Sequence, residues 1–381
     1  MSNVAHRIGV ISLEQRIEDP AETKFEDLYQ AIGLNTGNFM FTNAVFRQIG
    51  GNLTQIGFFF DPKKINNEFD ALVVPAANWI NDITDWTWLV NLLEKIEVPI
   101  ITIGIGLQAD SKELSKVRVS ESSMRLVKLL SNKSKWISCR GDFTRDWLVS
   151  IGITNVVTTG CPSIYIGFHD TKCKYDDCDT VVLQGTRYWV SGEFIRSNNA
   201  NRQMYYLAGR LDLPIIYQSE AEEIDHLVYS VNGDDEHAKT RMSDLAKLYG
   251  FASDADMRNY LSRKGRLFFD IDQWSGYIKR NIGVIGTRLH GAIVALNSGK
   301  PACLITHDSR TQEVADFARI PQLTKSNYSE MSKDGIVKIL EDTDLSFYYE
   351  NRKSNAATYQ QFLEACDLQP NYAGIVTDYR P

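Results

Sequence analysis

Short apolar segments alternate with helical patterns along most of this 381-residue chain. Amphipathic patterns at 38–49, 85–96, around 122–130 and at 142–152 separate the first set of apolar runs. Apolar strands joined by amphipathic helices form parallel βαβ units with both faces of the sheet covered. The alternation therefore predicts an α/β fold built on parallel sheets. The runs of this first set are RIGVISL (7–13), LTQIGFFF (53–60), DALVVP (70–75), PIITIGIGL (99–107), WISCR (136–140) and NVVTTG (155–160).

A charged segment without periodicity, IGFHDTKCKYDDCD (166–179), interrupts this alternation and is typical of a linker. A second alternating set follows, with strands predicted at 180–185, 213–219, 266–270, 284–287 and 301–306. A chain of this length favours two domains over one core. We predict an α/β fold of two Rossmann-like domains with parallel sheets facing a cleft. The predicted units are 1–168, 180–344, and a C-terminal helix and tail at 345–381 that returns to the first domain.

Composition and charge narrow the classes of function. The formal net charge of -7 argues against nucleic-acid binding, so a local cluster of arginines must hold any anionic ligand. No apolar run approaches the roughly 18 to 20 residues of a membrane span, and the first residues do not resemble a secretory signal. The six cysteines are scattered through the chain, as in proteins that keep reduced thiols. These features together predict a cytoplasmic protein.

The stretch GTRLHGAIVALNSGKP (286–301) places an arginine and a histidine where a strand gives way to a helix. The apolar positions 289, 292, 293 and 296 share one helical face, and Gly299 ends the helix. Arg288 and His290 therefore lie in the turn and the first helical turn, where unpaired N–H groups and the helix dipole favour anions. Guanidinium adds two parallel hydrogen bonds to a phosphate or carboxylate. The turn predicts an anion site.

His290 needs a separate explanation, because the dipole disfavours imidazolium at a helix N-terminus. One alternative is a neutral, hydrogen-bonded histidine with a structural role. The other is a proton-transfer group beside the anion site, which the position at the carboxyl end of a strand favours. We expect Arg288 and His290 to open into the cleft between the domains, with Arg140 or Arg310 within reach of the same ligand.

The stretch GTRLHGAIVALNSGKPACLITHDSRTQEVADF (286–317) resembles the C-terminal signature of the polysaccharide pyruvyl transferase family. SCRGDFTRDWLVSIGITNVVTTGCPSIY (138–165) is similar to the segment that closes the first half of that family. FDALVVPAANW, VPIITIGIGLQ and NTGNFMFTNAVFRQI resemble its N-terminal strands, Asn-x-Gly loop and helix. The pieces cover most of the chain in the family's order, and the R-L-H block is the specific one. The chain departs from the family at Asn38, where an acidic residue is common, and at PAAN (75–78), where a glycine-rich turn is common.

The resemblance implies transfer of the enolpyruvyl unit of phosphoenolpyruvate to two hydroxyls of a sugar, which gives a cyclic pyruvate ketal and phosphate. It implies no cofactor and no metal. Arg288 matches the family's donor-binding arginine and His290 its acid–base residue, while Asn38 falls on the acceptor side. The acceptor would be a sugar or a lipid-linked glycan, and a lipid-linked acceptor would bring the protein to a membrane surface.

Further arginines are expected at strand ends. Arg140 follows WISC, with Asp142 as the predicted N-cap of the next helix, and ion pairing with a nearby carboxylate is the equal alternative. Arg310 lies in a first helical turn after a capping box predicted from Ser309 and Gln312. Arg187 stands beside two aromatic residues that suit a sugar face but are more often packing. His307 and Asp308 are weaker candidates for handling the sugar hydroxyls.

The sequence leaves two rival functions open. A nucleotide-sugar glycosyltransferase has the same glycosyltransferase-B-like architecture, and a non-catalytic glycan- or anion-binding relative would bind without releasing phosphate. A zinc site at His169, Cys173 and Cys178 is disfavoured because no second paired motif accompanies it.

Overall fold

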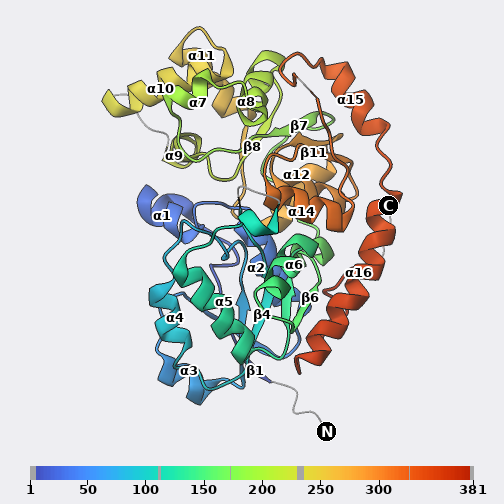
Figure 1. The fold of residues 1–381 in the computed structure, drawn as a ribbon. Coiled ribbons are helices and arrows are strands. Elements are labelled where there is room, and N and C mark those ends of the chain that lie inside the picture. Colours follow the sequence, from blue (N-terminus) through green and yellow to red (C-terminus); the bar gives the residue numbers. More distant parts are fainter. Residues whose placement is uncertain (1–5, 110–112, 172, 230–235, 326, 378–381) are drawn as a thin grey trace.

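The computed structural model of the protein describes residues 6–109, 113–171, 173–229, 236–325 and 327–377. Two sheets form the centres of two α/β domains, which lie one above the other in Figure 1. The N-terminal sheet has six strands in the order β2-β1-β3-β4-β5-β6, and the C-terminal sheet has five in the order β11-β10-β7-β8-β9. Every strand pair in both sheets is parallel. The predicted fold class is confirmed.

Each apolar run of the sequence overlaps one strand, and β2, β9 and β10 begin one residue before the predicted run. Strands β3, β4, β7 and β10 are buried at every position, which explains why they read as continuous apolar runs without alternation. The N-terminal sheet consists of β1 Arg7–Ile11, β2 Asn52–Ile56, β3 Ala71–Pro75, β4 Ile100–Ile105, β5 Ile137–Cys139 and β6 Val156–Thr158. The C-terminal sheet consists of β7 Val181–Gln184, β8 Ile215–Tyr217, β9 Gly265–Leu267, β10 Gly283–Gly286 and β11 Ala302–Leu304.

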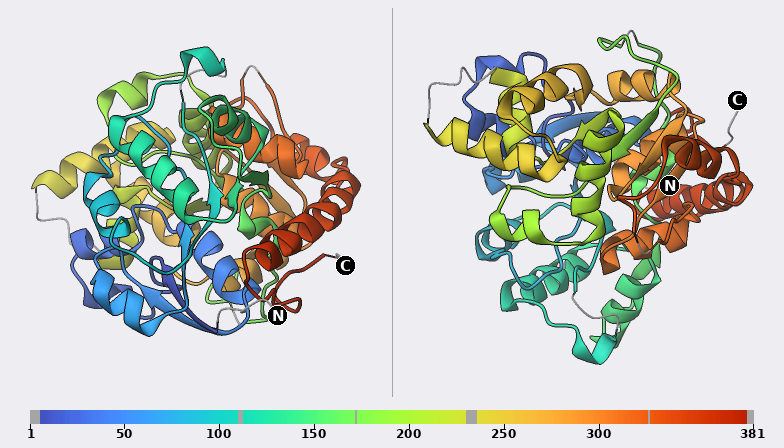
Figure 2. Two further views of the ribbon diagram at one scale, coloured as in Figure 1. Left: turned by 60° about the horizontal axis from the view of Figure 1, so that its bottom comes forward. Right: turned by 90° about the horizontal axis from the view of Figure 1, so that it is seen from above.

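Helices cover both sheets (Figure 2). The N-terminal domain contains α1 Phe25–Ala31, α2 Asn38–Gln48, α3 Pro62–Glu68, α4 Thr87–Leu93, α5 Glu121–Lys133 and α6 Asp142–Ser150, with 3-10 segments η1 Pro20–Glu22, η2 Leu114–Lys116 and η3 Pro162–Tyr165. The C-terminal domain contains α7 Gly192–Arg196, α8 Ala200–Leu211, α9 Ala221–Tyr229, α10 Glu236–Tyr249, α11 Asp254–Lys264, α12 Ile271–Lys279, α13 Leu289–Asn297, α14 Ser309–Ala318 and α15 Lys333–Glu341. The chain closes with α16 Ser346–Ala365.

Two predicted helix caps differ from the structure by one residue. Asp142 is the first residue of α6 rather than its N-cap, which is Gly141, and its carboxylate pairs with Arg145 one turn later. Asp308 rather than Ser309 caps α14, and its partner in the capping box is Thr311. A carboxylate one residue earlier accepts the helix N–H at 2.8 Å, so Asp308 outcompetes the serine for that position.

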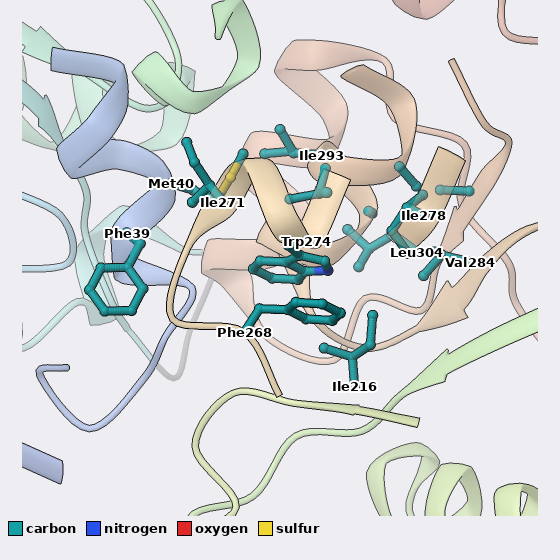
Figure 3. Packing of buried hydrophobic residues seen from close by; sticks show 14 of the residues in the cluster. Phe39, Met40, Ile216, Phe268, Ile271, Trp274, Ile278, Val284, Ile293 and Leu304 are labelled. Carbon is teal, nitrogen blue, oxygen red and sulfur yellow. The ribbon is translucent and has the colours of Figure 1, made fainter. Parts of the chain in front are cut away.

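Helix α2 joins the two domains through the apolar core. Phe39 and Met40 belong to the same buried cluster as Ile271, Trp274 and Ile293 of the C-terminal domain, and Figure 3 shows these side chains together. The opposite end of α2 is tied to α12 by an ion pair. The N-terminal helix that follows the Asn-x-Gly loop therefore fixes the position of one sheet relative to the other.

Helix α16 runs along the outside of both domains (Figures 1 and 2). Tyr359 of α16 stacks on Tyr165 of η3 with ring centroids 5.3 Å apart. The residues after the helix bond to the N-terminal domain, because Gly50 N donates to Gln369 O at 2.7 Å and Asn371 N to Gln48 O at 2.8 Å. The end of the described chain is thus packed on the first domain. Within the described residues, no helix has both the length and the apolar character that crossing a membrane requires.

Candidate functional site

The carboxyl ends of the strands of both sheets meet at the domain boundary. Ser309 Oγ, after β11, donates to Ala109 O, after β4, at 2.8 Å. Thr36 N, before α2, donates to Gln218 O, after β8, at 2.8 Å. Strand-end loops of parallel sheets are where ligands usually bind. The two sets of loops are therefore in direct contact in this structure.

His290 is the second residue of α13 and lies at this boundary. Its Nε2 is 3.8 Å from Cys161 Sγ of the N-terminal domain, and its ring centroid is 6.1 Å from that of Phe41 in α2. A Cβ atom added to Gly37 would lie 3.1 Å from His290 Nδ1 and 2.5 Å from Gln218 Oε1. The N-terminal loop thus needs glycine to approach the histidine this closely.

The environment keeps His290 neutral. Burial among protein atoms, followed by the positive charges of Arg140 and Arg288, lowers its pKa to about 3. Because imidazolium is disfavoured both by the site and by the helix N-terminus, the ring is uncharged at neutral pH. It is able to accept a proton at one nitrogen and to donate one from the other.

Arg288 caps α13 from inside the C-terminal domain. Its guanidinium donates to Gly185 O at 2.8 Å, to Arg187 O at 3.1 Å and to the Ser219 hydroxyl. It also forms an ion pair with Glu220 Oε1 at 2.9 Å. Burial raises the pKa of Glu220, but the charge and hydrogen bond of Arg288, the backbone N–H of Gln218 and the charge of Arg187 together lower it overall. Contrary to expectation, Arg288 turns inward and its charge is compensated within the protein.

Arg187 also has internal partners. Its guanidinium is buried and pairs with Glu222 at 2.6 Å and with Glu223, both on α9. Burial is the main cause that raises the pKa of Glu223 to about 7. Arg187 was predicted to contact the ligand. In the structure two carboxylates compensate its positive charge, so little of that charge remains to attract an anion. The neighbouring Tyr188 and Trp189 are 47% and 52% exposed at the edge of the boundary.

Arg140, at the end of β5, differs from both. It is only 5% exposed, and its Nε donates to Gly104 O at 3.0 Å and its Nη1 to Asn78 Oδ1 at 2.8 Å. Within the described residues, no carboxylate lies close enough to form an ion pair with it. The nearby Glu313 interacts with it at longer range, but that carboxylate accepts from Thr144 N at 2.6 Å and Thr144 Oγ1 at 2.9 Å. Arg140 is a buried cation held by neutral groups.

Arg310 reaches the same strand end from the other domain. Its Nη1 donates to Gln108 Oε1 at 3.1 Å, just after β4, while its Nη2 pairs with Asp308 Oδ2 at 2.6 Å. Its side chain is 28% exposed. Since Arg140 also bonds to β4, both guanidinium groups lie at the end of that strand. Burial lowers the pKa of the neighbouring His307, and the positive charges of Arg310 and Arg288 lower this pKa further.

Asn38, predicted on the acceptor side, has a local role. Its Nδ2 donates to Ile32 O at 3.1 Å and to Gly33 O at 3.0 Å, across the turn between α1 and α2. Those two bonds use both hydrogens of the amide, so the side chain fixes the approach of the Asn-x-Gly loop. The structure brings Arg140, Arg288 and His290 together and leaves Asn38 and Arg187 in structural contacts.

Several polar residues of the boundary were missed. Each lies within three residues of the end of a strand, and the strand-end rule that selected the arginines applies equally to neutral side chains. They are Asn78 after β3, Gln108 after β4, Cys161 after β6 and Gln218 after β8.

A separate pocket of about 600 Å³ lies between the domains on the side of the α2–α12 ion pair. Its lining includes Asn43 and Arg47 of α2, Gln55 of β2, and Asp270 and Asp272 at the start of α12. Arg47 Nη2 and Asp272 Oδ2 are 2.7 Å apart. The predicted site residues do not line this pocket. Among the described residues there is no group of three or more His, Cys, Asp or Glu side chains that could hold a metal ion.

Two parallel α/β domains that meet at their strand ends around a neutral histidine and a buried arginine define a class of two-domain α/β proteins with a polar site between the domains. Within this class, the model of the polysaccharide pyruvyl transferase family matches residues 18–309. The match covers most of the chain, so the protein belongs to this family of transferases.

Other comparisons concern solved structures of low sequence identity. UDP-N-acetylglucosamine 2-epimerase from Rickettsia bellii is 12% identical, with 96% of this chain and 97% of that chain covered and a TM-score of 0.49. MnaA of S. aureus, solved with UDP, is 11% identical, with 96% and 99% covered and a TM-score of 0.45. A search of curated proteins finds no match.

Proposed function

We propose that the protein transfers the enolpyruvyl unit of phosphoenolpyruvate to two hydroxyls of a sugar in a glycan or its precursor, forming a pyruvate ketal and releasing phosphate. Membership of the polysaccharide pyruvyl transferase family supports the transfer of a pyruvyl group. The observation that carries the proposal is Arg140, a buried guanidinium bonded to neutral groups only. A buried charge without a direct ion pair is costly, since Glu313 acts on Arg140 only at longer range, and an anionic donor would supply a direct partner.

The donor fits the cations at the end of β4. Phosphoenolpyruvate carries a phosphate and a carboxylate, and guanidinium binds each through parallel hydrogen bonds. Arg140 and Arg310 approach this strand end from opposite domains. We assign donor binding to these two arginines, because Arg140 forms no ion pair with a described carboxylate and Arg310, although paired with Asp308, keeps a side chain that is 28% exposed. Arg288 would instead hold the strand-to-helix turn, because it is buried and Glu220 already compensates its charge.

His290 is the proposed proton-transfer group. Ketal formation requires a proton to reach the methylene carbon of the donor and requires the two sugar hydroxyls to lose theirs. A neutral imidazole serves both needs, since one nitrogen accepts while the other donates. Its low pKa, about 3, leaves the ring neutral at neutral pH, so that one nitrogen has a lone pair able to accept the proton of a sugar hydroxyl.

The acceptor would approach from the exposed edge of the boundary. Trp189 is half exposed and packs at its other side against Phe25 and Tyr29 of α1, at centroid distances of 6.1 and 5.8 Å. Aromatic rings with one apolar face free suit the face of a sugar. If the glycan is lipid-linked, this edge would face the membrane surface that carries it.

The decisive experiment measures phosphate release from phosphoenolpyruvate in the presence of nucleotide sugars, lipid-linked glycans and polysaccharides, each tested separately. We expect release with one acceptor class and a product mass increased by one pyruvate ketal. Release of a nucleoside diphosphate without phosphoenolpyruvate would instead identify a glycosyltransferase. Donor binding without release for any acceptor would identify a non-catalytic relative.

A further inference from the structure

Cys161 contacts the histidine of the site from the opposite domain. It lies between β6 and η3 and is fully buried. Its Sγ is 3.8 Å from His290 Nε2 and 3.0 Å from Ser163 Oγ. A thiol is a weak donor and a weak acceptor, and the sulfur contact is within the reach of a hydrogen bond. The two side chains form a thiol–imidazole pair across the domain boundary.

The other side of the ring is lined by amide oxygens. Asn35 Oδ1 and Gln218 Oε1 gather with His290 Nδ1 around the position that a Cβ of Gly37 would occupy. Asn35 Oδ1 accepts from Gly37 N at 2.8 Å, and Gln218 Nε2 donates to Gln184 Oε1 at 3.3 Å. Both amide oxygens therefore lie on the side of the ring that carries Nδ1. A thiol that donates to Nε2 requires the hydrogen of the neutral ring to be on Nδ1, and oxygen acceptors on that side are compatible with it.

We infer that Cys161 is a positioning and relay residue that supplies a proton to the enolpyruvyl carbon through His290. This inference rests on the proposed function. The Nδ1 hydrogen of His290 passes to the methylene carbon of phosphoenolpyruvate while the Cys161 thiol hydrogen passes to Nε2. The imidazole stays neutral and changes tautomer, and the thiol becomes thiolate.

The remaining steps restore the pair. The first sugar hydroxyl bonds to the cationic carbon, and its proton returns to Nδ1 while the Nε2 hydrogen returns to the thiolate. The second hydroxyl then displaces phosphate from the same carbon, and its proton leaves with the phosphate. Bonds and protons balance without an oxidant, a metal or a third donor.

The charges around the histidine explain why a relay is needed. Burial, and then the charges of Arg140 and Arg288, oppose a positive charge on His290. An imidazolium waiting to protonate the donor would therefore be scarce at neutral pH. A relay lets His290 donate without ever being a cation. It also requires the domains to be together, because Cys161 and His290 lie on different domains.

The first test does not depend on any substrate. Nitrogen NMR of protein labelled at histidine distinguishes protonated from unprotonated ring nitrogens, and the His290→Asn variant assigns the signals among the six histidines. We expect His290 to carry its hydrogen on Nδ1 at neutral pH and its Nε2 signal to shift in Cys161→Ala. A hydrogen on Nε2 would overturn the inference, whether or not the protein transfers pyruvyl groups.

The second test compares turnover in Cys161→Ala and Cys161→Ser. Both should lower kcat by about a hundredfold and leave the KM for phosphoenolpyruvate nearly unchanged, because neither touches the donor. Serine keeps a hydrogen-bond donor of similar shape but holds its proton far more tightly. Recovery of kcat in Cys161→Ser would show that the side chain only orients the ring, and would overturn the relay.

Cys303→Ala is the matched control. Cys303 is also buried and contacts a hydroxyl, with Sγ 3.3 Å from Thr343 Oγ1, but it lies in β11, and no hydrogen bond joins its sulfur to a histidine among the residues that the structure describes. We expect full turnover in this variant. Equal losses in Cys303→Ala and Cys161→Ala would mean that loss of buried volume causes the effect, and would overturn the relay. If the unmodified protein transfers no pyruvyl group, the proposed function fails, and the NMR result still decides whether the thiol–imidazole pair exists.

Discussion

Arg140 and Arg288 each follow a parallel strand within two residues, one in each domain, yet their partners differ. Arg288 forms an ion pair with the fully buried Glu220, while Arg140 bonds to a carbonyl and an amide oxygen. A compensated cation stabilises its own domain, whereas one held by neutral groups remains available to an anion. The comparison teaches that the charge balance around a strand-end arginine, rather than its position, decides between structure and ligand.

Replacement of His290, whose pKa both arginines lower, gives the largest expected effect. His290→Asn keeps a polar side chain of similar shape but removes the transferable proton. We expect turnover to fall by about two to four orders of magnitude with much less change in donor affinity. Phosphate release and calorimetry measure the two quantities. Normal turnover would mean that the proton comes from another group, and His307 would be examined next.

Replacing Arg288 tests the compensated side of the comparison. Arg288→Met leaves Glu220 buried without its cation, so the free energy of unfolding should fall by about 3–5 kcal/mol. Sequence alone suggests that such a variant stays folded and mainly loses donor binding, because Arg288 is outside the apolar stripe of its helix. The ion pair with Glu220 reverses that expectation. Urea unfolding measures the change.

The control for Arg288→Met is Arg145→Met, which removes an exposed arginine from ion pairs on α6. Exposed pairs contribute about 0–1 kcal/mol. The double variant Arg288→Met, Glu220→Gln should recover part of the lost stability, because the uncompensated charge is gone. A stable Arg288→Met single variant with weakened donor binding would break the comparison.

Replacing Arg140 tests the other side. Arg140→Met should weaken phosphoenolpyruvate binding by about ten- to a hundredfold, from the loss of charge-assisted contacts of about 1.5–3 kcal/mol. The free energy of unfolding should fall less than in Arg288→Met, because Gly104 O and Asn78 Oδ1 lose a donor but no ion pair is broken. Calorimetry on this variant and on Arg145→Met separates a local effect from a general loss of positive charge. Unchanged affinity would remove Arg140 from the donor site.

The sequence predicted the sheets well because their strands are buried on both faces and read as uninterrupted apolar runs. It also placed His290 at the start of a helix after β10. The sequence could not predict the ion-pair and hydrogen-bond partners of the arginines. Glu220 lies 68 residues from Arg288 in the chain, and no local pattern links a carboxylate after β8 to a turn after β10. Cys161 was overlooked for the same reason, since only the packing of the two domains brings it to His290.

The pH dependence of stability gives the smallest effect and measures how strongly the arginines act on His290. The pKa of His290 is lowered to about 3 in the folded protein, whereas a histidine in an unfolded chain titrates near 6.5. Below about pH 6.5 this histidine binds a proton in the unfolded chain but not in the folded protein. The free energy of unfolding therefore falls as the pH drops toward 3.

This single group should cost up to about 1.4 kcal/mol per pH unit in that window. His290→Asn removes the cost, so its unfolding free energy should fall less steeply than that of the unmodified protein between pH 6.5 and 4. Glu223 has the opposite sign, because its pKa is raised to about 7 and its contribution is lost as the pH rises. Glu223 is present in both proteins, and its effect cancels in the difference.

Arg140→Met should flatten the slope in part, because Arg140 lowers the pKa of His290 more than Arg288 does. Equal slopes for the unmodified protein and His290→Asn in urea unfolding would mean that His290 is charged in the folded state and that the two arginines do not hold it neutral.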